Sequence, residues 1–476
     1  MNASSSPLTT LVMKFGGTSV GSPDAMAQTA RIAHEQQKES PRLVVVTSAL
    51  SGMTDLLLNS ATSAARGDIQ TYQQAAQTLK SKHDAILKSL VHDKTRQEQV
   101  AQEINLLILD FANLCQAIAV LGEATPRALD AVASLGERMA VRLLSAVIEA
   151  TGTPSQYVEA TRLVVTDDQF QNAHPDFEAT QAATRAVLNP LLDEGIVPVV
   201  TGFLGASKSG VTTTLGRGGS DYTGALLGAA LPADEVWIWT DVDGVMSADP
   251  RIIPDAFTIE ELTYREVSEL AYSGAKVLHP KTIRPVIEAG IGLRVLNTFN
   301  PSNPGTRLVA DHLARPGEKI VKSVTAIRGL RLVTLEGRGI LGVPGVAART
   351  FTSIAATGTS ISLISQASSE QAICIAVPLA STEAVINAIQ KEFRWELERK
   401  DIDRVWATGE VVTVTVVGEG MKSTPGVAGR VFGALGEKKI NVIAIAQGSS
   451  EVSISFILKV EDTRAAVQAL HDLVIK

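Results

Sequence analysis

The chain has 476 residues, 45% of them hydrophobic and 20% charged, so it can bury sizeable cores in two to four domains. Its 43 basic and 50 acidic residues give a net charge of −7, which lends no support to a nucleic-acid partner, and none is expected. Two cysteines, Cys115 and Cys374, are too few for a disulfide framework, and a zinc site is not expected either.

The first ten residues, MNASSSPLTT, contain neither a basic nor an apolar leader segment. Elsewhere no uncharged apolar run reaches the length that is needed to cross a bilayer. We therefore expect a cytoplasmic protein without a membrane partner, with a flexible tail over residues 1–10.

An α/β domain is expected to follow over residues 11–310. Short apolar strands over residues 11–15 and 43–47 flank a helical stretch over residues 23–38, which predicts a parallel βαβ unit. Residues 53–151 have helical spacing throughout and are interpreted as a helical lobe inserted in this domain.

The end of the first strand is a candidate anion site. Lys14 is followed by Gly16 and Gly17, so a cation and free backbone amides are expected where a parallel strand meets its helix.

A second candidate anion site lies in the run TTTLGRGGSDYT at residues 212–223. Its glycines free the backbone to approach a ligand, and Ser220 and Asp221 suit the N-cap of the helix predicted to follow. Arg217 can grip a carboxylate or phosphate with two hydrogen bonds. A plain strand-to-helix loop would have a similar pattern, so this run alone does not decide the function.

Two further polar segments lie in the same block. The strand over residues 236–239 runs into Thr240, Asp241 and Asp243, at the strand end where open α/β sheets bind ligands. Lys276 follows a predicted helix. Turn chemistry and a solvated surface lysine are the alternatives for these segments, but two anion sites with spaced cations favour phosphoryl transfer.

The C-terminal third is a duplication. Residues 341–370 return at residues 422–451, with Gln366 matching Gln447, and each copy has a ferredoxin-like order of elements. The second copy lacks a fourth strand, which residues 320–327 could supply. We therefore predict two modules, over residues 320–408 and 409–476, that share strands.

The motifs KFGGTSV, SLGER, TTTLGRGGSDYT, WTDVDGV and GAKVLHP resemble, in order and spacing, those of the aspartate kinases of the amino-acid kinase superfamily. The repeats resemble the tandem ACT modules of the same enzymes, and their QGSSE and PGVA elements are similar to the kinase half of aspartokinase-homoserine dehydrogenases. The resemblance implies a three-layer αβα domain with a mostly parallel open sheet, followed by two ferredoxin-like βαββαβ modules.

The activity implied by the resemblance is transfer of the γ-phosphoryl group of ATP to the side-chain carboxylate of L-aspartate, the first step towards the aspartate-family amino acids. By similarity, Lys14 lies between the two anions, Arg217 clamps the α-carboxylate, Glu137 accepts the ammonium, and Asp221 orients the ammonium or a metal-bound water. Ser48, Thr54 and Ser220 match substrate-side positions.

The nucleotide site implied by the resemblance comprises Gly16, Gly17, Thr240, Asp241 and Lys276. Met246 departs from the tyrosine that members often carry, so contacts to adenine or ribose should differ there. Mg²⁺ is expected through phosphates and water, and no protein metal ligand is assigned.

The ACT modules imply feedback control. Gln366 and Gln447 would bind an amino-acid effector, with threonine favoured over lysine, although a polar turn would also explain them. A homodimer or larger homo-oligomer through the modules is expected. Two other classes remain open: a sibling kinase that acts on glutamate, acetylglutamate or a nucleotide, and a non-catalytic amino-acid sensor.

Overall fold

The computed structural model describes residues 9–275, 278, 280–310, 320–338, 343–366, 371–422 and 424–475. The chain divides into two compact units. The first comprises Met1–Val245, Glu260–Tyr264 and Leu278–Ala310, and the second comprises Met246–Ile259, Arg265–Val277 and Asp311–Lys476.

The first unit is built on an eight-stranded sheet with the order β3-β5-β2-β1-β8-β10-β11-β9. All pairings in it are parallel except that of β10 with β11. The central strand β1 is buried along its whole length, as its apolar sequence TLVMKF predicts for a parallel strand covered on both faces. The strands are β1 (Thr10–Phe15), β2 (Arg42–Thr47), β3 (Ser155–Val158), β5 (Val197–Thr201), β8 (Glu235–Thr240), β9 (Glu261–Thr263), β10 (Gly292–Asn297) and β11 (Thr306–Val309).

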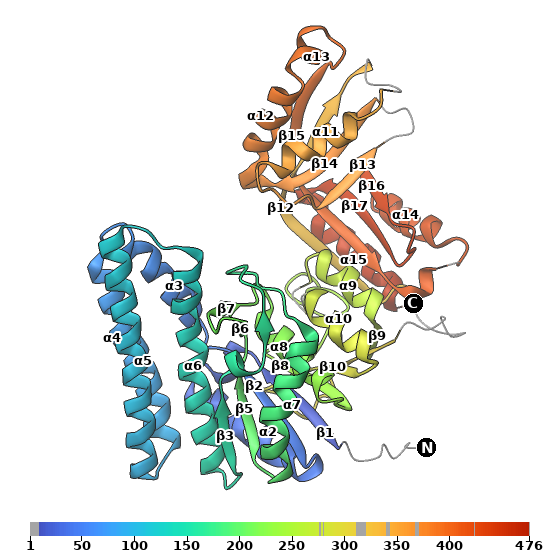
Figure 1. Ribbon diagram of the computed structural model, residues 1–476. Coiled ribbons are helices and arrows are strands. Elements are labelled where there is room, and N and C mark those ends of the chain that lie inside the picture. Colours follow the sequence, from blue (N-terminus) through green and yellow to red (C-terminus); the bar gives the residue numbers. More distant parts are fainter. Residues whose placement is uncertain are drawn as a thin grey trace, which may run out of the picture. The chain divides into compact units, whose positions relative to one another are not determined.

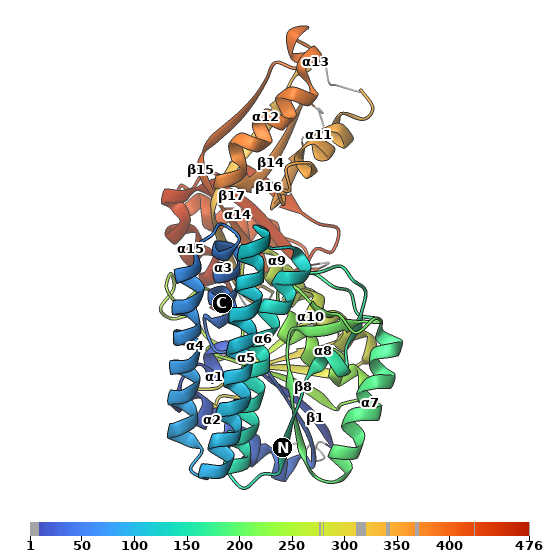
Figure 2. The same ribbon diagram turned by 60° about the vertical axis from the view of Figure 1, so that its left-hand side comes forward.

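Helices cover both faces of this sheet (Figures 1 and 2). On one face lie α1, α2 and α6, and on the other lie α7, α8 and α10. The predicted three-layer αβα class is thereby confirmed, as is the mostly parallel open sheet. The helices are α1 (Gly17–Val20), α2 (Pro23–Glu39), α6 (Pro126–Ala150), α7 (Phe177–Asp193), α8 (Gly219–Ala230) and α10 (Pro280–Ala289).

The helical lobe consists of α3 (Met53–Ala64), α4 (Ile69–Leu90), α5 (Lys94–Leu121) and α6, which pack against one another. Three of these helices begin at a side chain that accepts a hydrogen bond from a backbone N–H of the first turn: Asp68, Asp93 and Thr125. The lobe therefore follows from local capping signals together with one apolar face per helix.

Among the described residues, α5 is long and apolar enough to cross a membrane by length and composition. The expectation concerned uncharged runs, and Asp110 lies within the apolar stretch of α5, so this helix does not contradict it. Its residues Val100, Ile104, Phe111 and Cys115 are buried in the core of the lobe, and a core helix passes the same test. The finding by itself assigns no membrane role.

A small three-stranded sheet of β4 (Val165–Thr166), β6 (Leu204–Ser207) and β7 (Thr212–Thr214) completes the first unit. Strand β5 ends at Thr201, and Phe203, two residues further on, has a φ of +68°, which is incompatible with a continuous strand.

The second unit contains a six-stranded sheet with the order β13-β14-β12-β15-β17-β16. Its two central strands, β12 (Ser323–Glu336) and β15 (Arg404–Val417), pair with each other in antiparallel fashion over both repeats. The first half of β12 pairs with the part of β15 that also pairs with β17, and the second half pairs with β14. The outer strands are β13 (Leu363–Gln366), β14 (Ala372–Pro378), β16 (Ala444–Gln447) and β17 (Ser453–Lys459).

Each repeat has its own helices and its own core. The first core contains Ile354, Val385 and Phe393, and the second contains Val431, Phe456 and Leu470. The helices are α11 (Val346–Ala355), α12 (Thr382–Glu392), α13 (Arg394–Glu398), α14 (Val427–Glu437) and α15 (Thr463–Ile475).

Two segments that the sequence places inside the α/β domain pack in the second unit. Ala248 and Ile253 lie in the core of the second repeat. Helix α9 (Tyr264–Tyr272) is joined to this unit by the buried Glu266, which pairs with Lys322 at 3.2 Å. The domain bounds 11–310, 320–408 and 409–476 stay a prediction.

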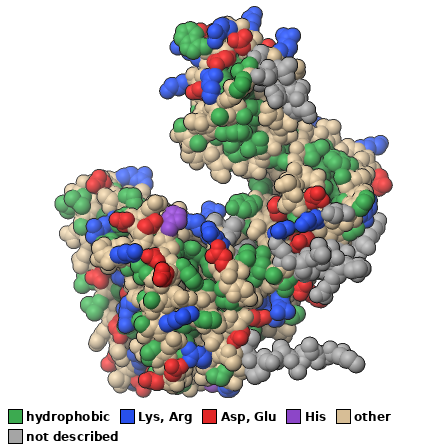
Figure 3. All heavy atoms as spheres, turned by 45° about the vertical axis from the view of Figure 1, so that its right-hand side comes forward, with side chains coloured by type: hydrophobic (Ala, Val, Ile, Leu, Met, Phe, Trp, Pro, Cys, Tyr) green, Lys and Arg blue, Asp and Glu red, His purple; other side chains and the backbone are tan. Residues whose placement is uncertain are grey.

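Charged side chains of both signs are interspersed over the described surface on the face that Figure 3 shows. A field of one sign that could attract a polyanion is not evident on this face.

Candidate active site

A cavity of about 840 Å³ opens in the first unit at the carboxyl ends of β1, β2 and β8. Strand ends of this kind are where open α/β sheets bind their ligands. Ten residues singled out from the sequence line the cavity: Lys14, Gly16, Gly17, Ser48, Thr54, Glu137, Arg217, Ser220, Asp221 and Thr240.

Two other candidates for the nucleotide site are not found among the residues that line the cavity, for different reasons. Asp241 is not among the described residues that line the cavity, and it accepts a hydrogen bond from Thr240 Oγ1 at 3.1 Å. Lys276 lies outside the described residues. Met246 belongs to the second unit, so its suggested effect on the nucleotide stays a prediction.

Lys14 forms an ion pair with Asp221, which lies in the first turn of α8. Both side chains are largely buried, with 9% and 18% of their surfaces exposed. A buried ion pair is costly to separate unless another partner replaces each member. The Lys14 ammonium is thus held in place and can be shared with an incoming anion.

The glycine pair after β1 differs from the expectation. The Gly16 N–H donates to the Trp239 carbonyl at 3.0 Å, so this amide is not free for a ligand. The reason is that Gly16 precedes α1 and joins the end of β1 to the end of β8. At Gly17 a Cβ atom would lie 2.9 Å from the Ala49 carbonyl oxygen, so glycine is needed there for the close approach of the loop after β2.

The glycine-rich loop before α8 also begins its helix differently from the prediction. Gly218 is the N-cap, with a φ of +71°, so Ser220 and Asp221 lie in the first turn and not at the cap. The prediction was wrong because the cap position has a left-handed backbone conformation, which favours glycine. The helix therefore begins earlier in the chain, at Gly219. Asp221 is still well placed, since a carboxylate in the first turn interacts favourably with the helix dipole.

Glu137 on α6 is a buried carboxyl in the wall of this cavity, with 3% of its surface exposed. One oxygen accepts a long hydrogen bond from the Ala49 N–H at 3.4 Å, and among the described residues Oε2 has no hydrogen-bond partner. Burial raises the pKa of this carboxyl to about 8. A buried acceptor without a partner suits a ligand that brings a positive charge.

Asp130 is a second carboxyl of α6 in the cavity wall, and the sequence reasoning missed it. It lies seven residues before Glu137, so the two side chains share one face of the helix. The available signal was the seven-residue spacing of these two acids on one helix.

The loop after β8 is fixed from another direction. Asp243 accepts hydrogen bonds from Asn297 Nδ2 at 2.7 Å and from Asn300 Nδ2 at 3.1 Å. Asp243 therefore fixes the loop after β8 to the end of β10 and the residues after it, through contacts that are distant in sequence and not through a local turn. Among the described residues, no group of three or more His, Cys, Asp or Glu side chains could hold a metal ion.

The model of the amino acid kinase family matches residues 9–297, and the ACT domain model matches residues 333–393 and 414–473. The chain is 35% identical to the bifunctional aspartokinase/homoserine dehydrogenase of Daucus carota, over 97% of this chain and 50% of that protein. It spans about half the length of the bifunctional relatives that it matches. It is 32% identical to aspartokinase 1 of Arabidopsis thaliana, over 97% of this chain and 79% of that protein.

Among solved structures, E. coli aspartokinase III in complex with aspartate and ADP matches with a TM-score of 0.79 at 29% identity. The match covers 98% of this chain and all of that one. The same enzyme in complex with lysine and aspartate matches with a TM-score of 0.79 at 30% identity. The chain therefore belongs to the amino acid kinase family and, within it, to the aspartokinases.

Proposed function

We propose that this protein is an ATP-dependent aspartate kinase, which transfers the γ-phosphoryl group of ATP to the side-chain carboxylate of L-aspartate and gives 4-phospho-L-aspartate. The observation that carries the proposal is the composition of one cavity. It combines the cations Lys14 and Arg217 with Glu137, a buried carboxyl that lacks a partner for one oxygen. A free amino acid with a second carboxylate has the complementary charges.

The chemistry needs no general base. A carboxylate with an ordinary pKa of about 3.9 is already ionised at neutral pH. One of its oxygens attacks the γ-phosphorus, the bond from that phosphorus to the bridging oxygen breaks, and ADP leaves. The difficulty is the approach of two anions, which fixed positive groups overcome.

Lys14 would reduce the repulsion between the two anions, because its ammonium lies at the end of the central strand and is already oriented by Asp221. Arg217 would hold the α-carboxylate, and Glu137 would accept the ammonium. Ser48, Thr54 and Ser220 line the same cavity and can donate hydroxyl hydrogen bonds to the substrate.

ATP and Mg²⁺ are the proposed cosubstrate and metal. The relative of known structure that binds aspartate and ADP supports the nucleotide. Because the described residues hold no metal-binding cluster, the metal would be carried by phosphate oxygens and water, and it would lower the negative charge of the nucleotide.

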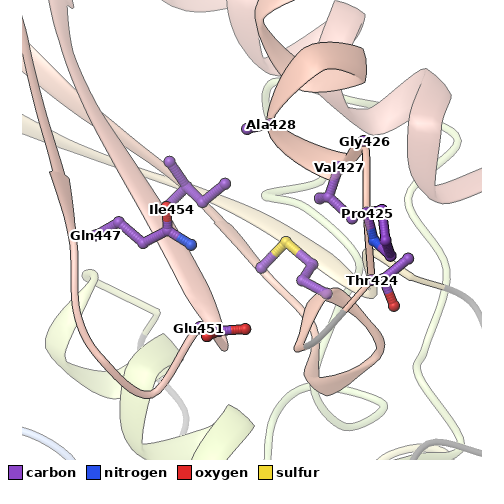
Figure 4. Close-up of a pocket in the computed structure, with 9 residues that line it drawn as sticks. Thr424, Pro425, Gly426, Val427, Ala428, Gln447, Glu451 and Ile454 are labelled. Carbon is purple, nitrogen blue, oxygen red and sulfur yellow. The ribbon is translucent and has the colours of Figure 1, made fainter.

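We also propose control by an amino-acid effector at the repeats. A pocket of about 380 Å³ lies in the second repeat, where Gln447 and Ile454 face the turn before α14, with Glu451 nearby (Figure 4). Its other lining residues are Met421, Thr424, Pro425, Gly426, Val427 and Ala428. Gln366 is the counterpart of Gln447 at the end of β13. Threonine is the favoured effector, and a homodimer through the repeats is the favoured assembly.

The test is formation of an acyl hydroxamate from ATP, hydroxylamine and each of aspartate, glutamate and N-acetylglutamate. We expect product with aspartate alone. Product with another acceptor would identify a sibling kinase, and no product with any acceptor, together with calorimetric binding of threonine, would identify a sensor.

A further inference from the structure

The Asp130 carboxylate joins two segments that are distant in sequence. It accepts hydrogen bonds from the Thr214 N–H at 2.9 Å and from Thr214 Oγ1 at 2.8 Å, at the end of β7. It also accepts the Gln171 N–H at 3.0 Å. Only 1% of its surface is exposed. Three donors converge on one buried carboxylate.

These two segments enclose the start of the glycine-rich loop. Gly216 follows Thr214 by two residues and has a φ of +75°. A Cβ atom there would lie 2.9 Å from Asn172 Oδ1 and 3.0 Å from the Gln171 carbonyl oxygen. The segment after Gln171 therefore forms a wall against which the loop rests, and Asp130 fixes both the wall and the strand that leads into the loop.

Arg217 is the next residue after Gly216, so its position depends on this arrangement. Asp130 and Glu137 lie on the same face of α6, two turns apart, which is about 10 Å along the helix axis. One rigid helix thus carries the carboxyl that would accept the ammonium and the carboxyl that fixes the loop of Arg217.

We propose that Asp130 is a positioning residue that sets the distance between Arg217 and Glu137 and thereby the selection of a free α-amino acid. This inference rests on the proposed function, because it assigns the substrate's α-carboxylate to Arg217 and its ammonium to Glu137.

The chemistry of Asp130 supports a role beyond packing. Burial of a carboxylate is costly, and among the described residues no cation pairs with Asp130. Burial raises the pKa of this carboxyl, while the hydrogen bonds from Gln171 and Thr214 oppose that rise. An apolar side chain would stabilise the helix face at lower cost, but it could not accept these three hydrogen bonds.

The test is the variant Asp130→Asn, whose amide group places a donor against an N–H that needs an acceptor. We expect the KM for aspartate to rise roughly 10- to 100-fold, while the KM for ATP stays within about twofold. The matched control is Asp234→Asn. Asp234 also accepts three hydrogen bonds, from Thr9 N, Thr9 Oγ1 and Thr10 N, but it lies outside the cavity lining.

A double-mutant cycle separates positioning from general stability. In an Arg217→Ala background, Asp130→Asn should raise the KM for aspartate by less than about twofold, because the residue that it positions is gone. The proposal would be overturned if the two substitutions had additive effects on the KM for aspartate. It would also be overturned if Asp130→Asn raised the KM for aspartate and the KM for ATP equally. Should Asp130→Asn fail to fold, Thr214→Val removes one of the three donors and should give the same selective effect at smaller size.

Hydrogen exchange gives a readout that is independent of turnover. Amides of residues 212–219 should exchange faster in Asp130→Asn than in the wild type, and Asp234→Asn should leave them unchanged. Unchanged exchange there would refute the positioning role. A wild-type protein that makes no aspartyl hydroxamate would contradict the proposed function, whereas an active wild type with an additive cycle contradicts only this inference.

Discussion

The cavity of the first unit and the pocket of the second repeat hold their polar groups in different ways. In the cavity, Lys14 and Glu137 are almost fully buried, Lys14 in an ion pair with Asp221 and Glu137 with a long hydrogen bond from the Ala49 N–H. In the repeat, Gln447 is exposed at the end of a strand, and the pocket wall is largely apolar. Buried polar groups in a fixed cavity suit stabilisation of a transition state, whereas an exposed amide suits reversible binding of an effector.

The largest expected effect comes from the buried cation. Lys14→Ala removes the charge proposed to bridge the two anions, and it also leaves Asp221 without its ion-pair partner. We expect kcat to fall roughly 1,000-fold, measured by coupled release of ADP. Thermal melting of the same variant should show a folded protein. A fall of less than tenfold in a folded variant would remove Lys14 from the reaction.

Arg217→Ala should be the next largest in effect. Loss of a bidentate partner for the α-carboxylate should raise the KM for aspartate roughly 100-fold and change the KM for ATP little. Arg217→Lys keeps the charge without the planar pair of donors, so it should recover only part of the loss. Equal effects on both substrates would place Arg217 at the nucleotide instead.

The raised pKa of Glu137 predicts a pH dependence of substrate binding. Below about pH 8 the carboxyl of the free protein carries a proton, which an incoming ammonium must displace. The KM for aspartate should therefore fall by about tenfold per unit between about pH 6 and pH 8 and become constant above that range. Glu137→Gln should abolish the slope, and a slope that survives this substitution would contradict the assignment.

The same carboxyl affects stability with a defined sign. The folded state binds this proton more tightly than the unfolded chain, in which the pKa of the carboxyl is near 4.5. The contribution of this proton to the free energy of unfolding is therefore complete below pH 4.5 and is lost as the pH rises to about 8. Denaturant titrations should accordingly show less of this pH dependence in Glu137→Gln than in the wild type.

The smallest effect on turnover is expected in the repeats. Gln447→Ala should raise the concentration of threonine that gives half-maximal inhibition by roughly tenfold, measured against the variant's own activity without effector. Gln366→Ala provides the comparison at the equivalent position of the first repeat. If both variants respond to threonine and lysine as the wild type does, the effector sites lie elsewhere.

Local chemistry made much of the cavity predictable. Lys14 and Thr240 end apolar strands, and the run around Arg217 combines glycines with a cation, so each was visible within a few residues of sequence. Two of the differences from the prediction were in backbone detail. The Gly16 N–H donates to a carbonyl of β8, a strand that begins about 220 residues later. The left-handed conformation of Gly218 places the start of α8 before Ser220 and Asp221.

Contacts between distant segments were harder to predict. Asp130 accepts hydrogen bonds from Thr214 and Gln171, and the sequence of its own helix contains no sign of these partners. The short strand patterns of the repeats were recognised, but they merge into the 14-residue strands β12 and β15, which run through both repeats. Pairing over such distances depends on tertiary packing, which periodicity does not encode.

The most direct test of the account is a crystal structure with aspartate and a non-hydrolysable ATP analogue. We predict that Lys14 Nζ lies within hydrogen-bonding distance of both the side-chain carboxylate and the γ-phosphate, with Arg217 on the α-carboxylate and Glu137 on the ammonium. A structure in which Lys14 and Arg217 contact neither ligand would contradict the central claim.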